Sequence, residues 1–348
     1  MAGAAGAAAR RAGIREVAAA AGVSMSTVSN VLNRPGTVAP ATRQRVLAAM
    51  NAVGYVRNSA ARQLRGAPST VVGCLFLDSA NAYYAALARG VEDRIGEAGC
   101  VLVQCSTDMR AERELRYLRL LEEQGVRGLL VSPVAALPGD LVRLSRRGTP
   151  VVLLDHPRGA ADLCAATVDN VAGGELAARH LVELGHRRLA FVGVGTVRSI
   201  NDRLTGVRRA LRAAGLDPAK SLTELSLEPA SPDTIAARAA EALLGSEPRP
   251  TGVICGNDAT ALAVLRGARA RGLSVPGDFS LVGYDDVDFA AALSPALTTV
   301  RQPTYRLGHA AAGLLLSEAH PAHEHRELVF HPELVVREST RPVLWPAR

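Results

Sequence analysis

The sequence predicts an α/β protein in which a small all-helical head with a helix-turn-helix precedes a two-lobed core of doubly wound parallel sheets. Three observations predict this fold class. First, residues 1–67 hold nine arginines and one acidic residue, a net charge of +8, whereas the rest of the chain carries −1 of the total +7. Second, two short helical segments flank Gly22. Third, short apolar runs alternate with helical stretches over most of the chain beyond residue 68.

The head is expected to fold as three helices. The run I-R-E-V-A-A-A-A from residue 14 has high helix propensity and stops at Gly22, and Ser24 is a good N-cap for a second short helix. Two short helices joined by a glycine-containing turn are typical of a helix-turn-helix. A third helix, at about residues 40–52, begins with Pro40. The apolar side chains expected to pack these helices together are Val28, Val31, Leu32, Val46, Leu47 and Met50.

The second helix carries polar side chains on its outer face, which suits the major groove of DNA. Its N-terminal amides and hydroxyls can bind phosphates, and its outer side chains can meet base edges. The arginine excess of the same segment favours a polyanion as partner. A solubilising basic tail and a merely solvated helix face are the alternative explanations. The expected DNA contacts in this helix are Ser24, Met25, Ser26, Thr27, Ser29, Asn30 and Asn33.

Residues 55–65 read Y-V-R-N-S-A-A-R-Q-L-R, and they predict a short helix that Asn58 can cap. Leu64 lies between Arg62 and Arg65. It either docks on the core or inserts between base steps in the minor groove while the arginines hold the backbone. Asn58, Leu64 and Arg65 complete the expected DNA contacts. The second role needs two copies of the helix side by side, and therefore a dimer.

Seven apolar runs predict strands of the core. Continuous apolar strands separated by helices indicate parallel sheets covered on both faces, and about eight such units suit two sheets better than one. The runs span residues 71–77, 101–105, 128–132, 151–155, 189–194, 252–255 and 281–284.

Polar and aromatic residues follow several of these runs, at the strand ends where open α/β sheets bind ligands. Each Asp or Asn taken alone is explained by capping of the next helix. Together they supply carboxylates, an amide, a guanidinium and an aromatic surface, which suit a sugar or other polyol, or a nucleobase. Arg203 is expected in the loop after the run 189–194. The other candidate ligand contacts are Tyr83, Tyr84, Asp155, Asn257 and Asp285.

Several stretches of the chain resemble the LacI/GalR (lactose-repressor) family. In the head they are V-A-A-A-A-G-V-S-M-S-T-V-S-N-V-L-N, T-R-Q-R-V and G-Y-V-R-N-S-A-A-R-Q-L, in the family's order. In the core they include V-D-N-V-A-G-G, C-G-N-D-A-T-A-L and V-P-G-D-F-S-L-V-G-Y-D-D. The resemblance implies a periplasmic-binding-protein-like core in which the chain crosses between the lobes near residues 168–170, 300 and 330.

The resemblance also implies roles for particular residues. Met25, Ser26 and Asn30 take the base-reading positions, and Leu64 takes the minor-groove wedge position. Tyr83 and Tyr84 stack on a small-molecule effector. The residues that contact this effector are Asp155, Arg203, Asn257, Asp285 and Gln302.

The predicted organisation is a disordered tail (1–12), a helix-turn-helix domain (13–54), a hinge helix or linker (55–67), and an effector-binding and dimerisation core (68–348). We expect a transcription repressor whose affinity for a palindromic operator in double-stranded DNA is controlled by a small-molecule effector. The favoured effector is a sugar. A sugar-binding protein without a regulatory role and a regulator that responds to a nucleobase are the alternatives.

Other classes of protein are disfavoured by what the sequence lacks. It contains no G-x-x-x-x-G-K-[ST], H-E-x-x-H or G-x-S-x-G motif, so we expect no enzyme activity. No apolar run is long enough for a membrane span, and we expect a cytoplasmic homodimer without a membrane partner. The five cysteines are expected to be reduced core residues, and the loop with His320, His323 and His325 to be solvent-exposed. We therefore expect no cofactor and no functional metal.

Overall fold

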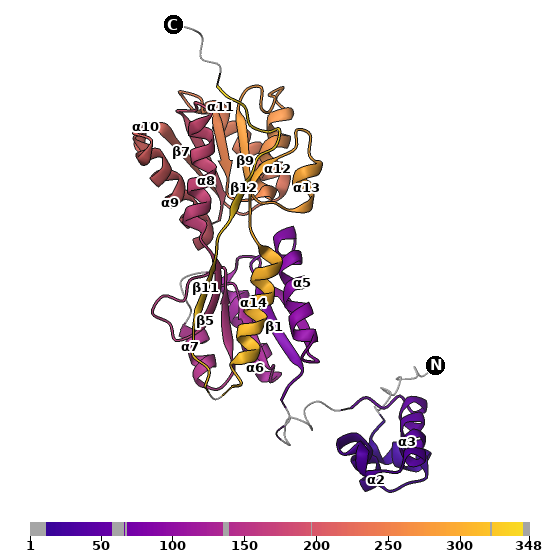
Figure 1. Cartoon of the computed structure of the whole chain (residues 1–348). Helices are drawn as coiled ribbons and strands as arrows, with labels where there is room; N and C mark the ends of the chain where they lie inside the picture. Colours follow the sequence, from indigo (N-terminus) through magenta and orange to yellow (C-terminus); the bar gives the residue numbers. More distant parts are fainter. Residues whose placement is uncertain are drawn as a thin grey trace, which may run out of the picture. The chain divides into compact units, whose positions relative to one another are not determined.

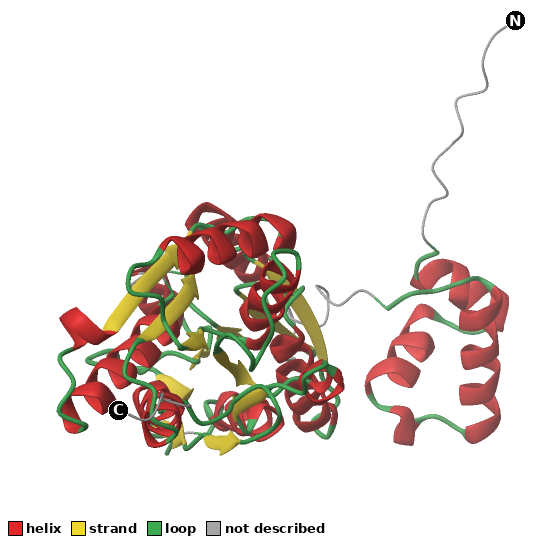
Figure 2. Cartoon of the chain, turned by 90° about the horizontal axis from the view of Figure 1, so that it is seen from above, coloured by secondary structure: helices red, strands yellow, loops and turns green. Residues whose placement is uncertain are grey.

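The structure is a computed structural model that describes residues 12–57, 66, 68–134, 139–195, 197–320 and 322–343. The chain divides into two compact units, which we call the head unit (1–68) and the core unit (69–348), and each is described by itself. The head unit contains helices only, whereas the core unit combines helices with strands (Figure 2).

The head unit consists of α1 (Ile14–Ala21), α2 (Met25–Asn33), a 3₁₀ turn (Pro35–Thr37) and α3 (Pro40–Ala52). Gly22 ends α1 in the left-handed region with φ +61°, where glycine is favoured. The Ser24 hydroxyl accepts a hydrogen bond from the Thr27 amide at 3.1 Å and caps α2. Both helix boundaries therefore follow from the local sequence.

The core of the head unit forms where the apolar spacing predicts it, with one exception. Val28 and Val46 are fully buried beside Val17 of α1. Leu47 was expected to pack inward as well, but it is 47 % exposed. That expectation is wrong because Ala49 completes the buried face of α3 instead.

The core unit is built on two six-stranded sheets, one in each lobe (Figure 1). The first sheet has the order β11-β5-β4-β3-β1-β2, and all its strand pairs are parallel. Its strands are β1 (Val71–Phe76), β2 (Val101–Ser106), β3 (Gly128–Val131), β4 (Val151–Leu154), β5 (Cys164–Val168) and β11 (Glu327–Phe330).

The second sheet has the order β12-β10-β9-β8-β6-β7 and is parallel except for the β10–β12 pair. Its strands are β6 (Leu189–Val194), β7 (Leu222–Leu227), β8 (Gly252–Cys255), β9 (Ser280–Asp285), β10 (Thr298–Arg301) and β12 (Glu333–Val335). The predicted class, a helical head with two parallel-sheet lobes, is confirmed.

Helices connect the parallel strands, as parallel pairing requires. Those of the first lobe are α5 (Ala82–Gly96), α6 (Ala111–Glu123), α7 (Gly139–Arg146) and α14 (Thr304–Ser317). Those of the second lobe are α8 (Asn170–Glu183), α9 (Arg198–Ala213), α10 (Pro218–Ser221), α11 (Pro232–Gly245), α12 (Asp258–Arg269) and α13 (Asp288–Ala292). Within the described residues, no helix has the length and hydropathy needed to cross a bilayer.

The chain passes between the lobes three times: from β5 to α8, from β10 to α14, and from β11 to β12. These crossings lie at residues 168–170, 301–304 and 330–333, where the family resemblance places them.

Five strands were not predicted by the apolar runs, namely β5, β7, β10, β11 and β12. Several of these lie at sheet edges or carry Thr, Ala and Glu, so they lack the continuous apolar signature.

Candidate functional site

A cavity of about 710 Å³ lies between the two lobes of the core unit. Residues at the carboxyl ends of strands line it, including Asp155 after β4, Asn257 after β8 and Asp285 at the end of β9. Its apolar lining includes Leu77 and Ile200. A small-molecule site typically occupies roughly 300–1,000 Å³ and joins an apolar lining to a few polar groups. The cavity therefore suits a small ligand that has polar groups and an apolar face.

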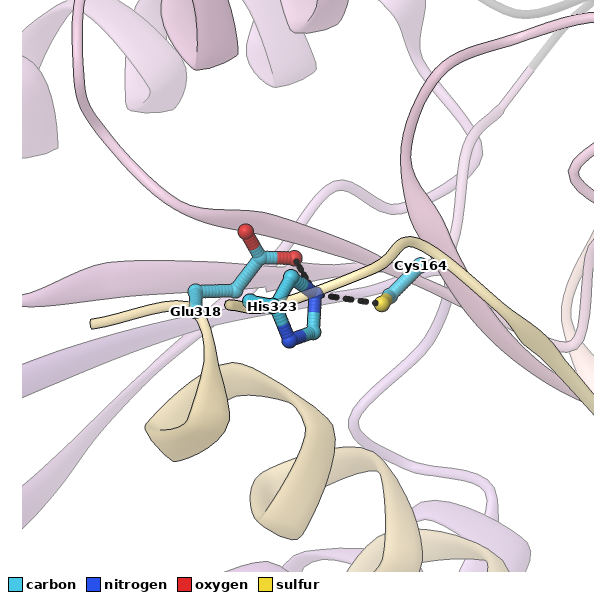
Figure 3. A group of neighbouring side chains, drawn as sticks. All are labelled: Cys164, Glu318 and His323. Carbon is cyan, nitrogen blue, oxygen red and sulfur yellow. Dashed lines mark hydrogen bonds and ion pairs between the residues drawn. The ribbon is translucent and has the colours of Figure 1, made fainter. Parts of the chain in front are cut away.

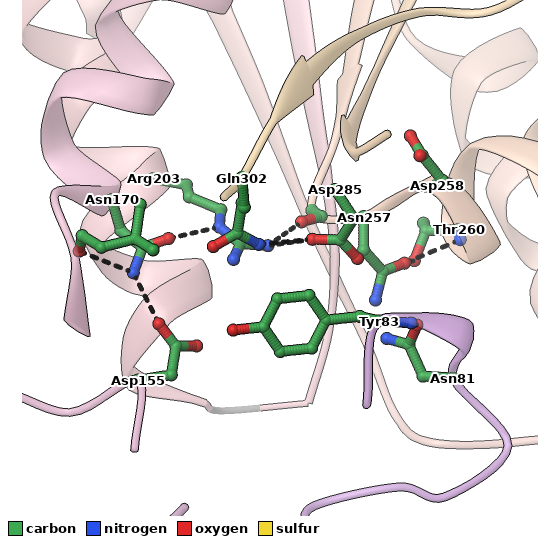
Figure 4. A network of polar contacts seen from close by, with 12 residues as sticks. Asn81, Tyr83, Asp155, Asn170, Arg203, Asn257, Asp258, Thr260, Asp285 and Gln302 are labelled. Atoms are coloured by element: carbon green, nitrogen blue, oxygen red, sulfur yellow. Dashed lines mark hydrogen bonds and ion pairs between the residues drawn. The ribbon is translucent and has the colours of Figure 1, made fainter. Parts of the chain in front are cut away.

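Arg203 is the central cation of this cavity and is only 5 % exposed (Figure 4). It lies on α9, so the expectation of a loop position is wrong: the helix begins at Arg198 and continues through it. Its Nε donates to Asn170 Oδ1 at 2.8 Å, and its Nη1 donates to the Gly256 carbonyl. The guanidinium lies 3.6 Å from the centre of the Tyr284 ring. These contacts fix the guanidinium before any ligand arrives.

Close helix packing sets the position of the Arg203 backbone. A Cβ atom on Gly174 of α8 would lie 1.9 Å from the Arg203 carbonyl oxygen, and one on Gly206 of α9 would lie 2.0 Å from the Val171 carbonyl oxygen. Only glycine permits this approach. The two helices therefore touch backbone to backbone, and the V-A-G-G stretch encodes the contact.

Asn170 is a site residue that sequence reasoning missed. It is 4 % exposed, lies at the first lobe crossing, and donates from Nδ2 to Asp155 Oδ1 at 3.1 Å while it accepts from Arg203. One amide thus links a carboxylate of the first lobe to the guanidinium of the second. The available signal was the polar pair D-N directly after β5, at the point where the chain changes lobe.

Two of the carboxylates that line the cavity have raised pKa values: Asp155 is half-buried, and Asp285 is 6 % exposed. Burial raises the pKa of Asp155, and Arg203 and Asn170 partly offset this rise. Burial also raises the pKa of Asp285 to about 8; Arg203, at 3.8 Å from its carboxylate, opposes the rise, and Asp258 adds to it. Such groups gain from new hydrogen-bond donors, because a donor that replaces lost water stabilises the charged form.

Gln302 follows β10 and is not among the residues that line the 710 Å³ cavity. It is 5 % exposed, and its Nε2 donates to Asp285 Oδ1 at 2.7 Å. Its Nε2 therefore contacts the carboxylate, whereas its Oε1 has no hydrogen-bond partner among the described residues. Asp286, next in sequence, turns away and pairs with Arg301 and Arg337 at 2.7 Å each.

Strained backbone is concentrated at this cavity. Among the described residues, the non-glycine residues with positive φ are Asp108, Met109, Asp155, Asp285 and Asp286. All except Asp286 line the cavity. Such a conformation costs about 1–3 kcal/mol per residue and persists where the surrounding structure enforces it, which is typical of ligand sites. The strain therefore marks this cavity independently of its chemistry.

The two tyrosines occupy different places in the cavity wall. Tyr84 stacks on Phe76, with ring centroids 4.9 Å apart and an interplanar angle of 28°, so one of its faces is already covered. Tyr83 is 4 % exposed, and its hydroxyl has no hydrogen-bond partner within the described part of the chain. Figure 4 shows this hydroxyl on the side of Asp155. A buried hydroxyl without a partner is costly, so Tyr83 is prepared for a polar ligand atom.

Asn257 combines a capping role with a place in the cavity wall. Its Oδ1 accepts from the Thr260 amide at 2.8 Å and from the Thr260 hydroxyl at 2.7 Å, and it caps α12. Its side chain is therefore held in one orientation at the cavity edge.

In the head unit, the outer face of α2 is open. Met25 is 50 % exposed, Ser24, Ser26, Asn30 and Asn33 are exposed, and Thr27 and Ser29 are partly exposed. Arg57 donates to Asn33 Oδ1 at 2.6 Å and so places a guanidinium beside this helix. Three further candidates, Asn58, Leu64 and Arg65, lie outside the described residues.

The histidine loop departs from its expected exposure. The side chains of His323 and His325 are only 10 % and 21 % exposed, so the expectation of solvent exposure is wrong for both. The physical reason is pairing: His325 contacts Asp162 and Glu318, and His323 contacts Glu318 and Cys164. Only His320 is exposed as expected.

Two family models match the chain. Residues 13–58 match the model of bacterial regulatory proteins of the lacI family, and residues 178–340 match the periplasmic binding protein-like domain. The HTH-type transcriptional regulator DegA of Bacillus subtilis (strain 168) is 33 % identical over 340 residues, which cover 95 % of this chain and 98 % of DegA.

Two solved structures are similar to the chain. A LacI family transcriptional regulator from Enterococcus faecium with bound ribose has a TM-score of 0.72 and 31 % identity, covering 79 % of this chain and 100 % of that one. The Lac repressor dimer bound to operator and an anti-inducer has a TM-score of 0.79 and 26 % identity, covering 95 % and 100 %. The chain belongs to the LacI family of bacterial regulatory proteins, which are DNA-binding transcriptional regulators with a ligand-binding domain and are not enzymes.

Proposed function

We propose that this regulator is a cytoplasmic repressor, and that a sugar bound in the cavity between the lobes controls its affinity for operator DNA. The observation that carries the proposal is the hydrogen-bonded series Asp155–Asn170–Arg203, which joins the two lobes and whose two end members line the cavity. A ligand that contacts these groups acts on both lobes at once. It shifts the equilibrium between two conformations only by its difference in affinity for them.

The chemistry of the cavity favours a sugar over a purely apolar ligand. Carboxylates accept hydrogen bonds from vicinal hydroxyls, and a fixed guanidinium donates to ring or hydroxyl oxygens. Asp155 and Asp285 supply the acceptors, Arg203 the donor, and the Tyr83 hydroxyl an additional partner. The similar regulator from Enterococcus faecium holds ribose, which supports a sugar as the ligand class. A nucleobase is the competing ligand for the experiment below.

The head unit supplies the DNA-binding surface in this proposal. Helix α2 enters the major groove, its capped N-terminus lies against phosphates, and Met25, Ser26 and Asn30 meet base edges. The chain acts as a homodimer on a palindromic operator, one head for each half-site, and Leu64 of each copy enters the minor groove. The similar Lac repressor structure is a dimer bound to operator, which supports this assembly.

The first experiment is selection of binding sites from random duplex DNA by the full-length protein at moderate salt. We expect one enriched palindrome. Asn30→Ala should change the enriched base at one position of each half-site, at a cost of roughly 1–3 kcal/mol for the lost contact. Asn51→Ala, an exposed asparagine on α3, is the matched control and should enrich the original site. Enrichment of no specific sequence would reject the DNA half of the proposal.

The second experiment uses that operator to screen sugars and nucleobases for a change in binding, followed by fluorescence anisotropy. We expect at least one sugar to change operator affinity by roughly 5–150-fold, the usual range of coupling between two sites. If only nucleobases changed operator binding, the effector would be a nucleobase and the proposal of a sugar effector would be rejected. Sedimentation of the protein–operator complex measures the number of chains, for which we expect two.

A further inference from the structure

A second cluster of potential ligand atoms lies in the first lobe, at the end of β5 remote from the cavity. Cys164 begins β5, whereas the cavity lies beyond the carboxyl ends of the strands. Glu318 follows the last residue of α14, and His323 lies in the segment that leads to β11. Figure 3 shows the three side chains directed toward one another.

The geometry of this cluster matches a small metal ion. The thiol sulfur, one imidazole nitrogen and one carboxylate oxygen all lie within 4.8 Å of one another. His323 Nε2 is 3.2 Å from Cys164 Sγ and 3.2 Å from Glu318 Oε1. A tetrahedral zinc ion with bonds of about 2.0–2.3 Å holds its ligand atoms about 3.3–3.8 Å apart. Small shifts of these side chains therefore bring all three atoms to bonding distance of one ion.

The hydrogen bonds around His323 aim its lone pair at the centre of the cluster. Ser317 donates its only hydroxyl hydrogen to the Leu314 carbonyl at 2.6 Å. The Ser317 oxygen, 3.1 Å from His323 Nδ1, therefore accepts from Nδ1–H. We assign the neutral His323 to this tautomer, in which Nε2 is bare and faces the thiol and the carboxylate. A histidine that ligates a metal is usually held in this way, by a hydrogen bond from its other nitrogen.

Glu318 is positioned by a separate contact. Its Oε2 lies 3.2 Å from His325 Nε2, and His325 Nδ1 lies 2.7 Å from Asp162 Oδ1. Its Oε1 has no hydrogen-bond partner among the described residues, and the Glu318 side chain is nine-tenths buried. In this tautomer the lone pairs of Glu318 Oε1 and His323 Nε2 lie 3.2 Å apart and repel each other unless a proton or a metal ion lies between them. A metal ion between them satisfies both atoms.

We propose that Cys164, Glu318 and His323 form a binding site for a divalent transition metal of the zinc type, with water as the fourth ligand. Thiolate and imidazole select zinc-like ions over magnesium and calcium, which prefer sets of oxygen ligands. The ion cross-links the start of β5, the end of α14 and the segment before β11. Metal binding therefore stabilises the first lobe, because the three ligands come together only in the folded chain.

The test is metal binding by the untagged full-length protein after removal of metals with a chelator. We expect the metal-free wild type to take up about one zinc per chain when zinc is added back and the excess is removed. Cobalt(II) added in place of zinc should give the near-ultraviolet charge-transfer band of a thiolate ligand. Zinc should also raise the melting temperature of the wild type.

Variants locate the site. Cys164→Ser should abolish the thiolate–cobalt band, and His323→Gln and Glu318→Gln should lower zinc affinity at least tenfold. Cys105→Ser and His331→Gln change a partly exposed cysteine and an exposed histidine outside the cluster, and should bind zinc like the wild type. Circular dichroism of each variant checks that it folds.

Two results would overturn the proposal. One is equal zinc retention by the wild type, Cys164→Ser and His323→Gln, which would place the metal elsewhere. The other is a wild-type protein that takes up no metal at micromolar concentration, or takes up cobalt without a thiolate band. The second result does not depend on the folding of any variant.

Discussion

The two lobes of the core unit have the same strand order but carry different side chains at equivalent positions. Their strand orders correspond position by position, so Asp155 after β4 is the counterpart of Asp285 at the end of β9. Both aspartates have positive φ and both line the cavity. Each lobe also has a pair of helices in backbone contact, α5 with α14 and α8 with α9.

The glycine contacts show where the lobes diverge. Gly308 of α14 lies against the carbonyl of Leu87, and Gly174 of α8 lies against the carbonyl of Arg203. Leu87 and Arg203 are therefore equivalent positions on α5 and α9. The first lobe fills its position with a fully buried leucine, whereas the second lobe fills it with a guanidinium aimed at the cavity. The same architecture serves packing in one lobe, and in our proposal it serves ligand recognition in the other.

The largest effect is expected from making the second lobe resemble the first. Arg203→Leu should abolish the effect of the ligand on operator binding, a loss of at least about 100-fold in ligand affinity, because Asp155 and Asp285 lose their cation. The change also leaves the buried Asn170 Oδ1 and the Gly256 carbonyl without their donors, which costs about 1–3 kcal/mol of stability for each group. Ligand titration and urea unfolding measure the two effects.

Two control variants accompany this change. Arg209→Ala, on the exposed side of α9, should alter neither ligand affinity nor stability appreciably. Leu87→Ala should destabilise the first lobe by about 2–5 kcal/mol. Ligand response that survives in Arg203→Leu would mean that the site has been misplaced.

The glycine contacts offer the next test. Gly174→Ala and Gly308→Ala each place a Cβ about 2 Å from a carbonyl oxygen, and each should destabilise the protein by roughly 3 kcal/mol. Gly174→Ala should also weaken ligand binding strongly, because it displaces the Arg203 backbone. Calorimetry with and without ligand separates the two effects, and equal ligand affinity in both variants would contradict the proposed role of the α8–α9 contact.

A smaller effect is expected at the aromatic wall. Tyr83→Phe removes a hydroxyl that has no partner in the described structure, so stability should stay the same or rise by up to about 1 kcal/mol. Ligand affinity should fall about tenfold, the loss of one hydrogen bond to the ligand. Titration calorimetry measures the affinity. Unchanged affinity would show that the hydroxyl faces no polar ligand atom.

The smallest effect concerns pH. An aspartate has a pKa of about 3.9 in the unfolded chain, and burial raises the pKa of Asp285 to about 8 in the folded protein. Between these values the folded state binds the additional proton, so this group makes stability fall as pH rises, and the fall is complete above about pH 8. Asp285→Asn removes this titration.

Buried histidines such as His186, whose pKa is lowered, have the opposite effect on the pH dependence of stability. The contribution of Asp285 is therefore obtained by subtracting the unfolding free energy of Asp285→Asn from that of the wild type at each pH. Relative to Asp285→Asn, the unfolding free energy of the wild type should fall by at least about 1 kcal/mol between pH 5 and pH 8. Urea unfolding at several pH values measures it. A flat difference would show that Asp285 has an ordinary pKa.

The sequence was sufficient for features that depend on local chemistry. Gly22 and Ser24 fixed the ends of two helices, and the apolar runs located the central strands. Residues at or just after the ends of those runs, such as Asp155 and Asp285, line one cavity because parallel strands end at a common edge.

What the sequence did not reveal depends on contacts between distant segments. Asn170 joins two lobes through side chains that lie 15 and 33 positions away in the chain. The hydrogen bond from Gln302 to Asp285 joins residues 17 positions apart at the ends of two neighbouring strands. The burial of His323 depends on Cys164, which is 159 positions distant. No periodicity or local spacing signals such pairings.

The most direct test of the central claim is operator binding, followed by anisotropy, with and without the sugar found in the screen, for the wild type and Arg203→Leu. The account predicts that the sugar changes the operator affinity of the wild type at least fivefold, and that Arg203→Leu binds the same operator but no longer responds. A response retained by Arg203→Leu, or a wild type whose operator affinity no ligand of the cavity alters, would contradict it.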